Sequence, residues 1–287
     1  MQRKNHHSVF GAYDQWSGAV DAGFQVNFLG VRTRIGFTNK AVTTEYPAFD
    51  EEYFEWIDLL EAVADAHGRF TMIELGAGRG RWLVNAAVAL RQRKPMTIPF
   101  IIGVEAEPTH FEQMKIHFRD NNLDPDKHLL IQAAVAAKDG HARFFTGYSL
   151  GWEGQSIVPS SWKNGWRIEK YPNAKIEKVK AISLKSILRP LKFVDLIDLD
   201  IQGQEYEVLK AAASDVNEKV ARVHIGTHDK ETLGTLGKDV EKGLREIFNS
   251  MGWSNICDYP AQNKSVTPYG EISFVDGVQT WLNPKLR

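Results

Sequence analysis

The stretch FTMIELGAGRGR, at residues 70–81, decides the fold of this chain. Its first half, Phe70–Leu75, is a short and mostly apolar run that predicts a buried β-strand. Glycines follow at positions 76, 78 and 80, and Arg81–Arg93 then has the pattern of a helix that ends before Pro95. Glycines at a strand-to-helix turn let the backbone approach a ligand closely, and the free N–H groups of the helix N-terminus attract anionic groups. The stretch therefore predicts a ligand-binding loop.

Acidic residues at two strand ends indicate which ligand the loop binds. A dinucleotide loop has the spacing G-x-G-x-x-G, which would put its third glycine where Arg81 stands, but the spacing here is G-x-G-x-G. Glu74 ends the first strand and suits the ammonium group of S-adenosylmethionine, whereas a pyrophosphate would gain nothing from it. Glu105 ends the second strand, where its carboxylate can accept both ribose hydroxyls. Ala133 and Ala134, which end the third strand, are expected to form a flat apolar wall for adenine.

Strands and helices alternate along most of the chain. Further strands are predicted at Phe100–Val104, Leu129–Val135, Phe193–Leu199 and Val220–Ile225, and further helices are predicted to begin at Pro108, Gln204 and Leu236. This alternation predicts an α/β fold in which helices cover both faces of a mostly parallel sheet.

The C-terminal residues predict a different kind of pairing. Ile272–Val275 and Val278–Trp281 flank Asp276-Gly277, which is a strong signal for a two-residue hairpin. A mostly parallel seven-stranded sheet that ends in an antiparallel hairpin is the Rossmann-like fold of class I methyltransferases. The expected organisation is an N-terminal appendage over residues 1–49 and a methyltransferase domain over residues 50–287, with an aromatic-rich insertion at about 147–178.

A second group of polar residues lies at the ends of the next two strands. Asp198 and Asp200 share one face of a strand, because side chains alternate with period two. His228 follows the neighbouring strand, so it is expected beside Asp200, whereas His224, inside that strand, is expected to be a satisfied core histidine. Buried carboxylates are costly unless they are paired or coordinated, which favours a functional role for the two aspartates.

Transfer of a methyl group to a hydroxyl requires that the hydroxyl lose its proton. His228 can serve as the base, or Asp200 can do so with His228 as its partner. Alternatively, Asp200, Glu205 and His228 can hold a divalent ion, Mg²⁺ or Mn²⁺, that lowers the pKa of the hydroxyl. The spacing leaves these mechanisms open.

The insertion is expected to contact the substrate. It is rich in Trp, Tyr, Gly and Ser and has neither helical nor strand periodicity. Trp152 and Gln155 are the predicted substrate-binding residues, although the aromatic side chains of the insertion can equally serve to anchor an irregular loop.

Composition excludes several classes of protein. The 35 basic and 36 acidic residues nearly cancel, so no net charge attracts nucleic acid. A single cysteine, Cys257, rules out an internal disulfide, and the chain contains no run of about 18 apolar residues that would span a membrane. A cytoplasmic enzyme without membrane insertion is expected, and a homo-oligomer remains compatible with the sequence.

The motifs together resemble the FkbM family of methyltransferases. The resemblance extends from about Phe70 to Trp253 and is carried by Glu74–Gly78, Val104–Pro108 and Asp200–Glu205. In the last motif Gln202 replaces the glutamate of the family's D-x-E-G-x-E signature, and Asp198 stands where many members carry lysine.

The resemblance implies that S-adenosylmethionine is the cofactor and that a hydroxyl of a sugar, glycan or natural product is the acceptor. The expected catalytic residues are Asp200, Glu205 and His228. The expected cofactor-binding residues are Glu74, Gly76, Ala77, Gly78, Gly80, Glu105, Ala106, Ala134 and Asp198. A nicotinamide-dependent reductase and a non-catalytic cofactor-binding scaffold are the alternatives.

Overall fold

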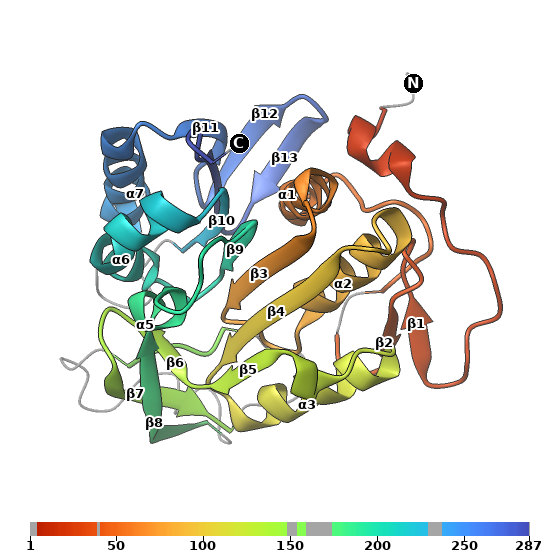
Figure 1. Ribbon diagram of the computed structural model, residues 1–287, viewed down its shortest axis with the longest axis horizontal. Helices are drawn as coiled ribbons and strands as arrows, with labels where there is room; N and C mark the ends of the chain where they lie inside the picture. Colours follow the sequence, from red (N-terminus) through yellow and green to blue (C-terminus); the bar gives the residue numbers. More distant parts are fainter. Residues whose placement is uncertain (1–4, 39–40, 148–153, 159–173, 229–236, 287) are drawn as a thin grey trace.

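A seven-stranded sheet forms the centre of the molecule, in the order β5-β4-β3-β9-β10-β14-β11 (Figure 1). The computed structural model describes residues 5–38, 41–147, 154–158, 174–228 and 237–286. The strands of the sheet are β3 (Arg69–Leu75), β4 (Ile98–Glu105), β5 (Leu129–Gln132), β9 (Leu196–Leu199), β10 (Arg222–Thr227), β11 (Ser254–Tyr259) and β14 (Gly277–Leu282). The first five strands in this order are parallel, and β14 runs antiparallel to both of its neighbours. This is the mostly parallel sheet that the alternation of elements predicts.

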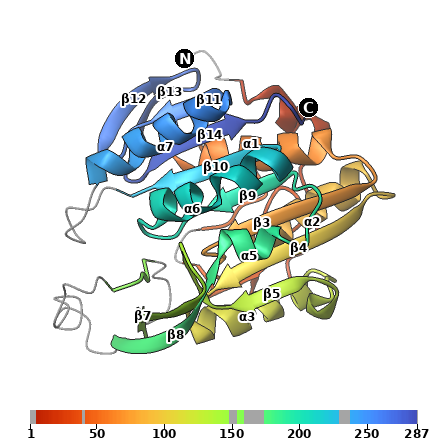
Figure 2. The ribbon, with the colours of Figure 1, turned by 60° about the vertical axis from the view of Figure 1, so that its left-hand side comes forward.

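Helices cover both faces of the sheet (Figure 2). One face is covered by α1 (Glu52–Asp65), α2 (Arg81–Arg93) and α3 (Pro108–Asp120), and the other by α5 (Leu184–Leu188), α6 (Glu205–Lys219) and α7 (Gly237–Met251). Each face has its own apolar cluster, which includes Trp56 and Leu83 on the first side and Leu209 and Phe248 on the second. In the described part of the chain, no helix is long and apolar enough to cross a membrane.

The antiparallel end of the sheet differs from the hairpin that the sequence predicts. Asp276-Gly277 does connect two strands, but β13 (Gly270–Phe274) pairs with β12 (Asn263–Thr267) and not with β14. β14 lies instead between β10 and β11. The predicted pairing of Ile272–Val275 with Val278–Trp281 is therefore wrong. β14 is buried at every position, so its register is set by the sheet and not by the turn before it.

The predicted third strand, Leu129–Val135, divides into two. β5 ends at Gln132, and β6 (Ala134–Ala136) leaves the main sheet to form a three-stranded sheet with β8 (Lys175–Ser183) and β7 (Gly140–Thr146). The start of β8 occupies the end of the predicted insertion.

The residues before α1 pack against the first face of the molecule. This segment contains a 3-10 helix, Ser8–Ala12, and the short strands β1 (Phe24–Val26) and β2 (Arg32–Arg34). Phe10 and Phe28 are almost fully buried in the same apolar cluster as α1 and α2. The backbone N–H of Arg32 donates to Asn121 Oδ1 at 2.8 Å, which ties β2 to the end of α3.

Candidate active site

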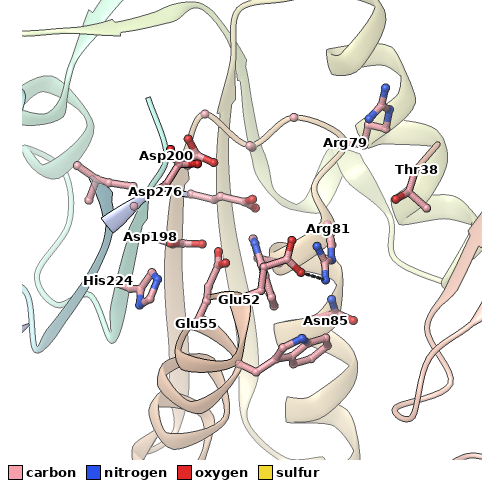
Figure 3. Close-up of a pocket in the computed structure, with 18 of the residues that line it drawn as sticks. Thr38, Glu52, Glu55, Arg79, Arg81, Asn85, Asp198, Asp200, His224 and Asp276 are labelled. Carbon is pink, nitrogen blue, oxygen red and sulfur yellow. Dashed lines mark hydrogen bonds and ion pairs between the residues drawn. The ribbon is translucent and has the colours of Figure 1, made fainter. Parts of the chain in front are cut away.

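A cavity of about 580 Å³ opens at the carboxyl ends of β3, β4, β9 and β10. Its lining includes the glycine loop, the first turn of α1 and several residues of the N-terminal segment, among them Thr38 and Tyr46. Figure 3 shows acidic side chains from α1, β9 and the β13–β14 connection on one side of this cavity, and Arg79 and Thr38 on the other. The carboxyl edge of a parallel sheet is where α/β proteins bind their ligands.

Three glycines of the loop adopt backbone conformations that other residues rarely adopt. Gly76, Gly78 and Gly80 have φ angles of 83°, 50° and 68°. A Cβ atom on Gly76 would lie 1.9 Å from the backbone oxygen of Asp200, so a side chain at this position is excluded. The N–H groups of Gly76 and Ala77 both donate to the Val104 carbonyl, at 3.0 and 2.9 Å. The loop is thereby held against the ends of β4 and β9.

Glu105 is fixed beside this loop by backbone donors. Its two carboxylate oxygens accept hydrogen bonds from Gly78 N and Glu107 N, each at 2.7 Å. Burial raises the pKa of Glu105 to about 7, although these N–H groups act in the opposite direction. The N–H of Ala106 also donates to this carboxylate, and the remaining acceptor positions suit a ribose with two adjacent hydroxyls.

Glu74 and Asp198 are neighbours across the sheet. They are register partners in the parallel pair β3–β9, and both are buried in the wall of the cavity. The N–H of Leu83, in the first turn of α2, donates to Glu74 Oε2 at 3.3 Å. Burial, followed by the charge of Asp198, raises the pKa of Glu74 well above its ordinary value. A cationic group of a ligand would stabilise the ionised forms of both carboxyls.

Asp200, His228 and Glu205 come together as the sequence predicts. His228 lies between the two carboxylates, with Nε2 3.1 Å from Asp200 Oδ1 and Nδ1 2.9 Å from Glu205 Oε1. Burial opposes a charge on His228, but the two carboxylates outweigh it and raise the pKa of His228 well above the ordinary value. Burial also acts to raise the pKa of Asp200, but the charge and hydrogen bond of His228 hold it below the ordinary value.

The three residues face different surroundings. Asp200 lines the cavity and its side chain is 59% exposed, whereas Glu205 is fully buried behind His228. Both ring nitrogens of His228 lie within hydrogen-bond distance of a carboxylate, and the raised pKa keeps the ring protonated, so it already carries the proton that a general base would have to accept. Of the mechanisms that the sequence leaves open, this geometry favours Asp200 as the group that contacts the acceptor, with His228 and Glu205 behind it.

Several other predicted residues also line the cavity. Ala106 and Ala134 pack against Phe144 in a small apolar cluster, and Ala133 also lines the cavity. Gln155 lies in the same lining and is buried. Trp152 lies outside the described residues.

Residues of α1 also line the cavity, and the sequence gives no direct sign of this. Glu52 and Glu55 belong to the first turn of α1, and Glu52 accepts a hydrogen bond from Arg81 at 2.7 Å (Figure 3). Glu55 contacts Asp198, and His224 lies beside them. Asp198 and His224 occupy paired positions on β9 and β10, which strand registration can predict, but the position of Glu55 depends on the packing of the helix.

The sequence resembles a known protein family and a curated protein. The family model named "Methyltransferase FkbM domain" matches residues 74–247. A curated protein of Jannaschia sp. (strain CCS1), named "Putative methyltransferase", is 26% identical to this chain over 294 residues, which cover 96% of this chain and 97% of the relative.

Two solved structures are among those that resemble the chain. Methyltransferase FkbM from Methylobacillus flagellatus KT has a TM-score of 0.45 and 10% identity, with 82% of this chain and 55% of that chain covered. The O-methyltransferase from Bacillus cereus, solved in complex with SAH, has a TM-score of 0.40 and 12% identity, with 82% and 84% covered. The family model spans more than half of the chain and contains the glycine loop, Glu105, Asp200 and His228. The chain is a methyltransferase and belongs to the FkbM family.

Proposed function

We propose that this methyltransferase transfers the methyl group of S-adenosylmethionine to a hydroxyl oxygen of a sugar, glycan or natural product. The observation that carries the proposal is the position of the Glu105 carboxylate, which is fixed by the glycine loop and opens into the same cavity as Asp200. A methyl donor bound at Glu105 would present its methyl group to an acceptor bound at Asp200.

The polar groups of the cavity match the parts of this cofactor. Glu105 would accept the ribose hydroxyls, and the apolar wall of Ala106 and Ala134 would contact adenine. Glu74, next to Asp198, would receive the ammonium group of the methionine part. A nicotinamide dinucleotide would instead place a pyrophosphate near these carboxylates, where the charges repel.

The acceptor side of the cavity suits a hydroxyl group. Methyl transfer is an in-line displacement at sulfur, so the enzyme mainly aligns donor and acceptor and excludes water. Asp200 would accept the hydrogen bond of the acceptor hydroxyl, and the charged His228 behind it would hold the carboxylate in place. The acceptor class itself follows from the family resemblance.

Calorimetric titration with S-adenosylhomocysteine tests the cofactor part of the proposal. We expect binding to the wild-type protein and a loss of about 1–3 kcal/mol in Glu105→Ala, which removes charge-assisted hydrogen bonds. Glu112→Ala is the matched control, because Glu112 is an exposed glutamate on α3 that forms an ion pair with Lys115. A folded wild-type protein that does not bind S-adenosylhomocysteine but binds NADH tightly would overturn the proposal in favour of a reductase.

A panel of hydroxyl acceptors with labelled S-adenosylmethionine tests the catalytic part. Methylation of at least one sugar or natural-product hydroxyl is expected, and Asp200→Asn should reduce it. Binding of S-adenosylhomocysteine without turnover on any member of a broad panel would instead favour a non-catalytic cofactor-binding scaffold.

A further inference from the structure

Glu55, Asp198 and His224 form a cluster in the wall of the cavity, separate from Asp200 and His228. The three side chains come from α1, β9 and β10 and converge in Figure 3. One potential ligand atom from each lies within 4.8 Å of those of the other two. Asp198 and His224 are 3% and 4% exposed, and all three residues line the cavity. These are the distances at which three side chains can share one ion.

The orientation of His224 is fixed from behind. Its Nδ1 lies 2.7 Å from Asp58 Oδ2, and Asp58 also accepts hydrogen bonds from Arg222, at 2.5 Å, and from Thr280. Asp58 is 2% exposed, so this pairing is well protected from water. The ring nitrogen left for the cluster is Nε2. Histidine ligands of metal ions in proteins are usually oriented in this way, by a carboxylate on the other ring nitrogen.

The two carboxyl groups of the cluster are in direct contact. Asp198 is almost fully buried, and in the described part of the chain its hydrogen-bond partner is the carboxyl of Glu55. Two carboxyl groups at this distance cannot both be charged unless a cation lies between them. The imidazole of His224 adds a third potential ligand atom within 4.8 Å of these carboxyl oxygens, so the geometry of the cluster fits one shared metal ion.

We propose that Glu55, Asp198 and His224 Nε2 bind a divalent first-row transition-metal ion. Two carboxylate oxygens and one imidazole nitrogen suit Mn²⁺ or Zn²⁺, whereas Mg²⁺ prefers oxygen ligands and retains much of its water. Three protein ligands leave coordination positions that face the cavity, where water or an oxygen of the acceptor would bind. The binding of an acceptor oxygen to the ion rests on the proposed function, but the binding of the ion to the protein does not.

Titration with Mn²⁺ followed by electron paramagnetic resonance tests the site without any substrate. The signal of free Mn²⁺ should disappear up to one ion per chain in the wild-type protein. Glu55→Gln removes one charged ligand at a partly buried position and should weaken binding at least tenfold. Glu112→Gln is the control, because it removes an exposed acidic residue of α3 that does not line the cavity, and it should leave the affinity unchanged.

Pulsed electron paramagnetic resonance on the same samples identifies the nitrogen ligand. The bound Mn²⁺ should show coupling to one imidazole nitrogen, and His224→Gln should abolish that coupling. A folded protein that binds neither Mn²⁺ nor Zn²⁺ at millimolar concentration would overturn the proposal and leave Glu55 and Asp198 as a proton-sharing pair. Binding that survives both substitutions unchanged would also overturn it. Titration of the same protein with S-adenosylhomocysteine tests the cofactor proposal separately, because a protein that binds S-adenosylhomocysteine but no metal ion would contradict only the metal site.

Discussion

The ionisation of Glu105 should make cofactor affinity depend on pH. Burial raises the pKa of this carboxyl to about 7 from an ordinary value of 4.5. Because the ribose hydroxyls donate their hydrogen bonds to the ionised carboxylate, binding requires the deprotonated form. About one tenth of the molecules are ionised at pH 6 and about nine tenths at pH 8, so the affinity for S-adenosylhomocysteine should rise about tenfold over this interval. Calorimetric titrations at pH 6, 7 and 8 measure this rise.

The same shift affects the stability of the protein without cofactor. The folded-state pKa lies above the unfolded value, so the contribution to stability is complete below pH 4.5 and is lost as the pH rises through 7. The difference of about 2.5 pKa units corresponds to at most about 3 kcal/mol.

Glu105→Gln is the control for both effects, because its amide does not titrate. The charges of Glu107 and Glu74 also act on this group, and both residues remain in the variant. The part of the pH dependence that comes from Glu105 should therefore disappear in Glu105→Gln, and affinity should be low at each pH. A wild-type affinity that is constant between pH 6 and 8, or one that falls, would refute the reasoning.

Three further substitutions test other parts of the structure. Gly76→Ala introduces a Cβ atom 1.9 Å from the Asp200 carbonyl, in a left-handed conformation, and should lower stability by about 3 kcal/mol in urea unfolding and abolish S-adenosylhomocysteine binding. Arg222→Ala leaves the buried carboxylate of Asp58 without its guanidinium partner and should lower the free energy of unfolding by about 3–5 kcal/mol in the same assay. A variant with unchanged stability would show that the ion pair is not buried. His228→Gln removes the charged partner of Asp200, so kcat should fall about 10–100-fold while the affinity for S-adenosylhomocysteine stays constant. Equal losses in kcat and in affinity would contradict the role of His228 as the partner of Asp200.

The order of elements around the cofactor loop could be predicted because it depends on local patterns. The predicted helix Arg81–Arg93 has the bounds that the structure gives to α2, and Glu105 ends β4 as expected. The pairing of β14 could not be predicted in this way. Asp276-Gly277 gives a strong local hairpin signal, but the buried edge offered by β10 and β11 determines where β14 lies.

The site was predictable where it follows from strand ends and not where it depends on packing between distant segments. Asp200 and His228 follow adjacent strands, so their proximity could be inferred. The sequence predicts His224 to be a satisfied core histidine, and Asp58 does satisfy its Nδ1. The approach of Glu55 to the other ring nitrogen depends on how α1 packs, which its own sequence does not specify. The same holds for Thr38 and Tyr46, which reach the cavity from the N-terminal segment.

A crystal structure of the complex with S-adenosylhomocysteine would test the central claim most directly. We predict that both ribose hydroxyls lie within hydrogen-bond distance of the Glu105 carboxylate and that the sulfur faces Asp200. A cofactor bound elsewhere, or one whose sulfur points away from Asp200, would contradict the account.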